Sequence, residues 1–293
     1  MFDTTCRFIG ATCPKGAVLE PSDARGAAAS EGIGGILLAS CDLVLACETT
    51  RRAKNVFDFV PHARKTAPIV GNEIKGLEKA TLRSADQVVS IPMPGIGMES
   101  LNVGVAAAVA LWALTRSKGS HESRTARGKG GLPDVLFVAP DDPSEIGSVF
   151  RSAWAFGWKR AFLDDPHEVW FGRDRSIATQ GRAAARRFKN PLAILPYRNL
   201  GAKAYEVAYV LTYDRSVTPF SRMTVAEERD AVLVIPAAHA QTSEAVQAAE
   251  RAARKTMLFQ LDCPGDASLA HYRLAASIVL AEVANQRAGG RKR

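Results

Sequence analysis

The sequence predicts an α/β fold built on a mainly parallel sheet. Short apolar runs have the length of buried strands, and helical stretches alternate with them along the chain. This alternation is typical of strands joined by helical crossovers. With 293 residues, 47% of them apolar and 23% charged, the chain is long enough to bury a sizeable core as one large or two medium domains.

The first half is expected to contain three buried strands followed by one Ala-rich helix. The strands are predicted at residues 42–46, 67–70 and 87–91, and the helix at residues 101–114. In the second half, strands are predicted at residues 134–139, 160–163, 192–195, 208–211, 231–235 and 257–261. Helices are predicted between them, at residues 145–156, 176–188, 243–255 and 269–286.

A Gly/Ser-rich stretch at residues 117–131 separates the two halves. It contains four glycines and no apolar periodicity, which is typical of a flexible linker. The predicted domains are therefore residues 1–116 and 132–293. The halves also resemble each other, because Pro-Gly, Ser-Leu and an Ala-rich helix follow one another at residues 94–110 and again at 264–280. We expect an internal duplication in which the second copy has lost the Asn and Glu of the first.

The composition limits the class of protein. The net charge is +8, and Lys and Arg gather at residues 116–129, 173–203 and 291–293, which permits a polyanionic partner. The five cysteines lack CxxC spacing, so neither a metal site nor a disulfide framework is expected. With no signal pattern and no run of apolar residues long enough to span a bilayer, we expect a cytoplasmic protein without a membrane partner.

Two loops in the first half carry the candidate chemistry. Residues 69–77 read Ile-Val-Gly-Asn-Glu-Ile-Lys-Gly-Leu, and residues 90–103 read Ser-Ile-Pro-Met-Pro-Gly-Ile-Gly-Met-Glu-Ser-Leu-Asn-Val. Gly71 and Gly76 lack a Cβ, so backbone groups can approach a ligand closely. Asn72 and Glu73 add a donor and acceptors. The second loop leads into a helix, whose N-terminus favours electronegative groups and for which Ser100 is the expected cap.

Together these loops resemble the second and third signature motifs of the SpoU branch of the knotted (SPOUT) RNA methyltransferases. The resemblance implies an α/β fold with a SPOUT-type trefoil knot that binds S-adenosylmethionine. The residues that it implies for cofactor binding are Val70, Gly71, Asn72, Gly76, Ile91, Met93 and Leu101. Those that it implies on the methyl-transfer side are Glu73, Ser100 and Asn102.

The remaining signature motif resembles residues 142–151, which read Asp-Pro-Ser-Glu-Ile-Gly-Ser-Val-Phe-Arg. The resemblance implies that Arg151, assisted by a substrate phosphate, makes a ribose hydroxyl nucleophilic. Without the motif, Arg151 would be read as pairing on its own helix. Glu145 stands where the family has Asn, and it could pair with Arg151 or repel a phosphate.

In the family this motif precedes the other two, whereas here it follows them. Family members are homodimers in which the arginine enters the partner's pocket. The reversed order therefore predicts an intrachain pseudo-dimer of two SPOUT-like halves with one composite site, in which Arg151 lies near Asn102. A circular permutation is the alternative.

The expected activity is S-adenosylmethionine-dependent methylation of a ribose 2'-hydroxyl in rRNA or tRNA. The second basic cluster is expected to bind RNA through Arg182, Arg186, Arg187 and Lys189. Two alternatives remain open: a methyltransferase for a small molecule, and a catalytically inactive RNA-binding protein. The protein is expected as a monomeric pseudo-dimer or a homodimer.

Overall fold

The computed structural model describes residues 41–61, 65–71, 75–98, 100–116, 131–185, 190–225, 231–262 and 271–288. The chain forms two compact units. The first comprises residues 1–92 and 101–115, and the second residues 93–100 and 116–293. Residues 117–130 of the predicted linker lie outside the described residues. All strand pairings among the described residues are parallel, which confirms the predicted α/β class.

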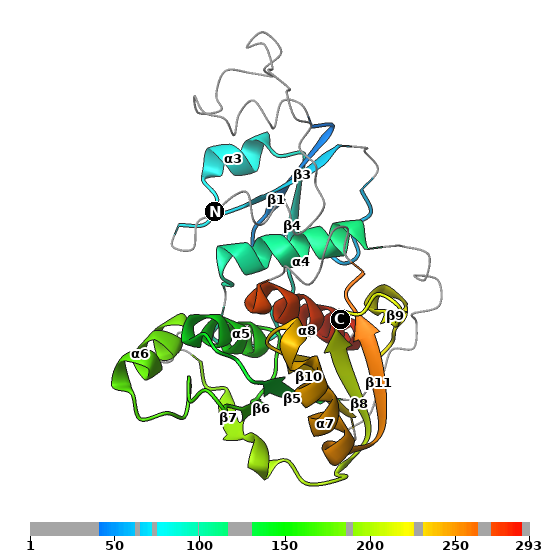
Figure 1. The fold of residues 1–293 in the computed structure, drawn as a ribbon. Helices are drawn as coiled ribbons and strands as arrows, with labels where there is room; N and C mark the ends of the chain where they lie inside the picture. Colours follow the sequence, from blue (N-terminus) through cyan, green and yellow to red (C-terminus); the bar gives the residue numbers. More distant parts are fainter. Residues whose placement is uncertain are drawn as a thin grey trace, which may run out of the picture. The chain divides into compact units, whose positions relative to one another are not determined.

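The first unit contains a four-stranded sheet with the order β2-β4-β1-β3. Its strands are β1 (Leu43–Cys47), β2 (Lys54–Asn55), β3 (Thr66–Val70) and β4 (Gln87–Ser90). Its helices are α3 (Lys79–Ser84) and α4 (Val103–Thr115). Helix α4 packs against β3 (Figure 1). It is apolar on all sides, which is typical of a buried helix rather than of an amphipathic surface helix.

The second unit contains a seven-stranded sheet with the order β7-β6-β5-β10-β8-β11-β9. Its strands are β5 (Asp134–Val138), β6 (Arg160–Asp164), β7 (Ala193–Pro196), β8 (Tyr205–Thr212), β9 (Thr218–Pro219), β10 (Ala231–Pro236) and β11 (Ala253–Gln260). Its α-helices are α5 (Pro143–Ala155), α6 (Arg175–Ala184), α7 (Thr242–Ala252) and α8 (Tyr272–Ala288). Three short 3₁₀ turns, Tyr197–Asn199, Phe220–Arg222 and His239–Gln241, complete this unit's described elements.

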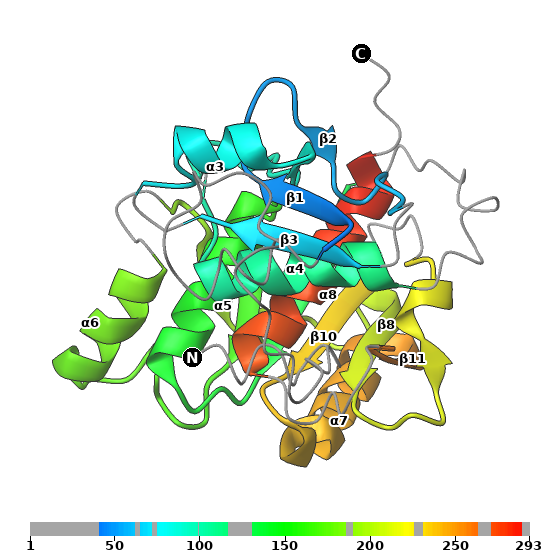
Figure 2. The same ribbon diagram turned by 90° about the horizontal axis from the view of Figure 1, so that it is seen from above.

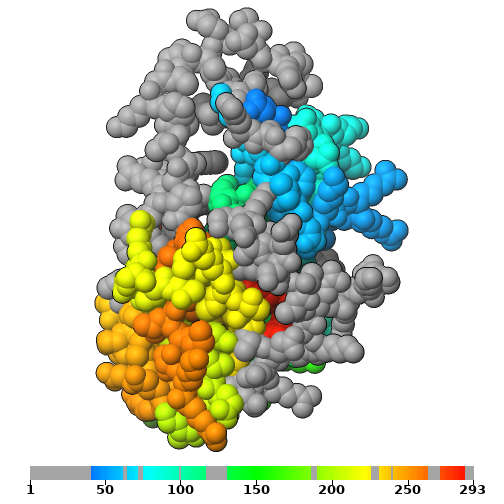
Figure 3. Space-filling view, turned by 90° about the vertical axis from the view of Figure 1, so that its right-hand side faces the viewer, coloured from blue at the N-terminus to red at the C-terminus, as the bar shows by residue number. Residues whose placement is uncertain are grey.

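Helices cover both faces of the second sheet, as the alternating side chains of β5 show. Phe137 contacts the rings of Phe150 on α5 and Tyr272 on α8. Leu136 and Val138, its neighbours in the strand, belong to the core cluster that includes the alanines of α7. Since successive side chains of a strand point to opposite faces, α5 and α8 cover one face and α7 the other (Figures 1 and 2). Figure 3 shows the β8–β11 part of this unit from outside, in yellow and orange.

The two sheets share one strand order. Read from β9, the second sheet runs β9-β11-β8-β10 before it continues to β5, β6 and β7. This is the order β2-β4-β1-β3 of the first sheet when strands are matched in chain order, and α4 and α8 each follow the last of the four strands. A shared order of this kind is what the predicted duplication requires. The described part of the first unit has no counterpart of β5, β6 and β7.

The pairing of β8 with β11 accounts for the largest differences from the predicted boundaries. The helix expected to reach residue 255 ends at Ala252, and β11 begins at the next residue. The reason is tertiary, because β11 pairs with β8 from Ala253 opposite Tyr205 to Gln260 opposite Thr212, and this ladder satisfies backbone groups that helix α7 would otherwise use. The same pairing extends β8 beyond the predicted residues 208–211.

Candidate active site

The candidate cofactor loops follow the strands of the first sheet at one edge. Glu48 follows β1, Gly71 follows β3 and Ile91 follows β4. Because these strands are parallel, their carboxyl ends meet at the same edge, where open α/β sheets bind their ligands. The first residues of the two loops, Gly71 and Ile91, are twenty positions apart in the sequence and follow strands β3 and β4 of the same sheet.

The loop after β3 is closed tightly by its two glycines. An ideal Cβ on Gly71 would lie 2.4 Å from the carbonyl carbon of Gly76, so no other residue fits there without a backbone shift. Gly76 has φ +67°, a left-handed conformation that favours glycine. Asn72 and Glu73, between these glycines, lie outside the described residues.

A residue missed by the sequence analysis, Glu48, fixes the far end of this loop. One carboxylate oxygen accepts a hydrogen bond from the Leu77 N–H at 2.8 Å, and the other accepts from the Thr49 N–H at 3.0 Å. A Cβ on Gly76 would lie only 2.6 Å from the same carboxylate. The sequence signal for this role was an acidic residue directly after a buried strand.

The second loop supplies apolar walls and a helix cap. Ile91 and Leu101 are buried, and Met93 is half-buried. The Asn102 side-chain oxygen accepts from the Gly104 N–H at 2.9 Å and from the Val105 N–H at 3.4 Å. Asn102 therefore caps α4, and the expectation that Ser100 is the cap was wrong, because α4 begins two residues later than a Ser100 cap would require.

Ser100 instead binds the arginine of the remaining motif within the second unit. The Arg151 Nε–H donates to the Ser100 carbonyl oxygen at 2.9 Å, and Nη2 donates to Ser100 Oγ at 2.8 Å. Arg151 lies on α5 and is only 6% exposed. The reading in which Arg151 pairs only on its own helix was wrong, since these partners lie 51 residues away in sequence.

Glu145 forms its ion pair with Arg273 and not with Arg151. Its carboxylate pairs with the Arg273 guanidinium at 2.6 Å, and it also accepts from the Arg273 backbone N–H at 3.0 Å. Arg273 lies in the first turn of α8, where a negative charge is favourable. The negative charge of Glu145 is thus balanced inside the second unit.

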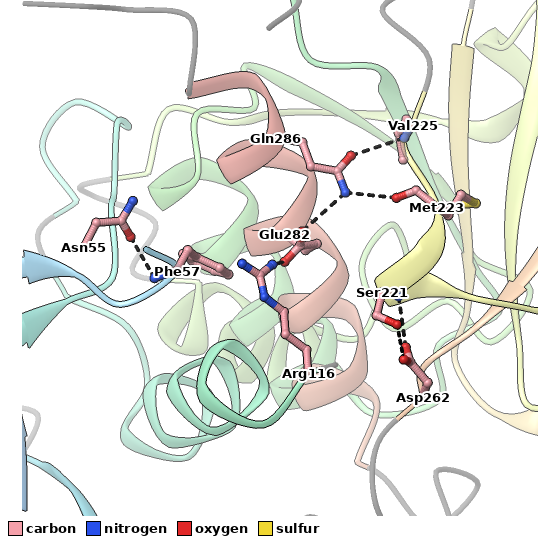
Figure 4. A network of polar contacts seen from close by, with 9 residues as sticks. All are labelled: Asn55, Phe57, Arg116, Ser221, Met223, Val225, Asp262, Glu282 and Gln286. Atoms are coloured by element: carbon pink, nitrogen blue, oxygen red, sulfur yellow. Dashed lines mark hydrogen bonds and ion pairs between the residues drawn. The ribbon is translucent and has the colours of Figure 1, made fainter. Parts of the chain in front are cut away.

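The described residues at the matching edge of the second sheet form hydrogen bonds with one another. The Ala237 N–H, just after β10, donates to the Val138 carbonyl at 3.0 Å. Asp262, which follows β11, accepts from both the backbone N–H and the hydroxyl of Ser221 (Figure 4). Tyr272 at the start of α8 is buried, and this burial raises the pKa of its phenol well above the ordinary value. The described residues at this edge therefore pair with each other and form no glycine cradle like that of Gly71.

The predicted RNA-binding residues are described in part. Arg182 is exposed on α6 and borders a cavity of about 320 Å³, whose lining includes Trp170 and Ile194. Arg186, Arg187 and Lys189 lie outside the described residues.

No thiol in the described part of the first-sheet edge is suited to nucleophilic chemistry. Burial and the neighbouring Glu48 raise the pKa of the Cys47 thiol to about 12, so it stays protonated near neutral pH. Across the described ranges, no group of three or more His, Cys, Asp or Glu side chains is placed to hold a metal ion. No helix in these same ranges has both the length and the apolarity to cross a membrane.

Comparison with known proteins places the loops in a family. The family model of the SpoU rRNA methylases matches residues 38–112, from just before β1 to near the end of α4. The predicted SpoU resemblance is confirmed. This SpoU segment includes both cofactor motifs, whereas Arg151 lies outside it.

A curated relative matches a similar length of sequence. The 23S rRNA (guanosine-2'-O-)-methyltransferase RlmB of Nitrosomonas europaea is 38% identical over 80 residues, which are 27% of this chain and 29% of the relative. The chain thus spans less than a third of that relative's length.

Solved structures of methyltransferases match more of the chain at lower identity. A probable methyltransferase from Bordetella pertussis is 14% identical, with 54% of this chain and 96% of that one covered and a TM-score of 0.40. The SpoU methyltransferase AviRb from Streptomyces viridochromogenes, solved with AdoMet, is 21% identical, with 57% and 64% covered and a TM-score of 0.37.

Proposed function

We propose that this protein is an S-adenosylmethionine-dependent RNA methyltransferase that acts on a ribose 2'-hydroxyl of rRNA or tRNA. The observation that carries the proposal is the pair of hydrogen bonds between Arg151 and Ser100. These residues come from two separate sequence motifs, and the family resemblance assigns both to methyl transfer. Ser100 lies within the SpoU segment, so Arg151 bonds to a residue of the second cofactor motif.

The described residues at the first-sheet edge fit S-adenosylmethionine. The loops after β3 and β4 offer backbone groups at Val70, Gly71, Ile91 and Leu101, and the missing Cβ of Gly71 allows a close approach. Apolar walls at Ile91 and Leu101 suit an adenine ring. When bound, the cofactor supplies a methyl group on a sulfonium, which an oxygen nucleophile can accept.

Arg151 would orient the substrate rather than act as a base. A guanidinium stays protonated at any physiological pH, so it cannot remove the hydroxyl proton by itself. It can hold a substrate phosphate next to the ribose hydroxyl, and that phosphate can accept the proton as the oxygen becomes nucleophilic. The two bonds to Ser100 fix the guanidinium plane for this role, and such positioning contributes much of the rate of a two-substrate reaction.

For the architecture, we propose that the loops form a trefoil knot and that the two halves are SPOUT-like copies forming one pseudo-dimer, with residues 1–116 and 132–293 as the domains. The shared strand order of the two sheets supports duplication. The hydrogen bonds that the described residues at the matching edge of the second sheet form with one another support a single cofactor site per chain. Circular permutation remains the alternative to duplication. The oligomeric state is a separate question, and light scattering would distinguish a monomeric pseudo-dimer from a homodimer.

RNA is the proposed partner, with Arg182, Arg186, Arg187 and Lys189 as the contacts. Binding through phosphates releases counterions, so the logarithm of the binding constant should fall linearly with the logarithm of salt concentration. One of the reasons for the small-molecule alternative was that Glu145 could repel a phosphate, and the Glu145–Arg273 pair weakens that reason. The inactive RNA-binding alternative predicts RNA binding without turnover.

The first test is calorimetric titration with S-adenosylmethionine, followed by methyl incorporation into rRNA and tRNA. One site per chain and 2'-O-methylated nucleosides after nuclease digestion are expected. Base-methylated nucleosides would reject the ribose assignment. No cofactor binding at all would reject the proposed function.

A further inference from the structure

The loop between Met93 and Ser100 rests on the last turns of α5, and both belong to the second unit. The Trp154 Nε1–H donates to the Ile96 carbonyl oxygen at 2.7 Å. The Gly95 N–H donates to the Ala155 carbonyl oxygen at 2.9 Å. An ideal Cβ on Gly95 would lie 1.8 Å from the Trp154 carbonyl oxygen, so the loop backbone lies directly on the helix.

One face of α5 therefore holds the loop at two points. Trp154 and Arg151 are three residues apart, which places their side chains on the same side of a helix. Trp154 holds the tip of the loop at Ile96, and Arg151 holds its end at Ser100. The Trp154 bond thus joins the helix of the candidate catalytic arginine to the cofactor loop of the SpoU segment.

The Trp154 contact is peripheral to the core. The side chain is only half-buried, and its bond to the loop is solvent-exposed. Met98 anchors the loop by burial at 2% exposure, but Ile96 at the loop tip is 85% exposed, so little apolar packing holds the tip itself. A tip with so few buried contacts depends on its hydrogen bonds for a single conformation.

We infer that Trp154 is a positioning residue: it holds the loop of residues 93–100 against α5 in the conformation that binds cofactor and presents Ser100 to Arg151. This inference rests on the proposed function. Trp154 itself touches the loop backbone and need not touch cofactor or RNA.

The test is Trp154→Phe, which keeps an aromatic ring and removes the N–H donor. Trp158→Phe is the matched control, because the Trp158 Nε1–H donates at 2.8 Å to the carbonyl oxygen of Pro133, a residue of the same unit that is not part of the loop. Trp154→Phe should raise the Kd for S-adenosylmethionine about tenfold. The loss of one hydrogen bond changes a binding equilibrium by about this factor. Its melting temperature should stay near that of the wild type. Trp158→Phe, which loses a buried bond, should melt earlier and bind cofactor normally.

Two further measurements separate positioning from general destabilisation. Hydrogen exchange of the free protein should become faster at residues 93–100 in Trp154→Phe and stay unchanged there in Trp158→Phe. Gly95→Ala displaces the same loop from the same helix turn, so its effect on affinity should not add to that of Trp154→Phe.

The outcomes distinguish the inference from the function on which it rests. A Trp154→Phe protein that binds cofactor as tightly as the wild type would overturn the inference and leave the proposed function standing. Weaker binding without faster exchange in the loop would also overturn it. A wild-type protein that does not bind cofactor would overturn the proposed function and the inference together.

Discussion

Removing one partner of the ion pair between Arg116 and Glu282 is expected to destabilise the second unit strongly. Arg116 directly follows α4, and Glu282 lies in the middle of α8 (Figure 4). Their side chains are 2% and 1% exposed. Glu282 also accepts a hydrogen bond from the Gln286 side chain, which in turn donates to the Met223 carbonyl.

Glu282→Gln keeps the shape of the side chain and removes the negative charge that Glu282 places beside the buried Arg116 guanidinium. Removing one partner of a buried pair costs about 3–5 kcal/mol. For a unit of this size each kcal/mol lowers the melting temperature by about 2–4 °C, so a decrease on the order of 10 °C is expected. Three of the four tryptophans lie in the second unit, so thermal and urea unfolding followed by tryptophan fluorescence mainly report this unit.

A surface pair in the same unit provides the control. Glu206 and Arg254 lie 3.2 Å apart, with side chains 54% and 69% exposed. Glu206→Gln should change stability by less than about 1 kcal/mol, because water screens exposed pairs. The double variant Arg116→Met/Glu282→Leu removes both charges and should recover most of the lost stability. If Glu282→Gln were no more destabilising than Glu206→Gln, the argument from burial would be refuted.

Three further predictions concern the candidate site. Arg151→Ala should abolish methyl transfer in single-turnover assays and leave the Kd for S-adenosylmethionine nearly unchanged; full activity would reject its catalytic role. Asn102→Ala removes the α4 cap, which consists of the bonds from the Gly104 and Val105 N–H groups. It should lower the free energy of unfolding by about 1 kcal/mol and also weaken cofactor binding. Gly71→Ala places a methyl group 2.4 Å from the Gly76 carbonyl carbon and should abolish calorimetric binding of the cofactor; normal binding would show that this loop is not the cradle.

The strands that were predicted best from the sequence are those whose residues are almost all apolar. The runs predicted at residues 134–139 and 231–235 correspond to β5 and β10 within one residue, because near-continuous apolar sequence is stable only inside a sheet covered on both faces. Helix α3 was missed because none of its residues is buried and no apolar stripe marks it. The two-residue strands β2 and β9 were missed because they exist only through pairing with β4 and β11.

For the site, the sequence by itself determined the two glycine- and proline-rich loops and the arginine motif, because turn chemistry and motif spacing are local properties of a chain. The tertiary structure decided which residues these motifs contact. It brought Ser100 to Arg151 across 51 residues and paired Glu145 with Arg273 across 128. It also placed Glu48 against the Leu77 N–H and Trp154 against the Ile96 carbonyl oxygen. Such contacts depend on strand order and helix packing, and these follow from the burial of the whole sheet rather than from any one segment.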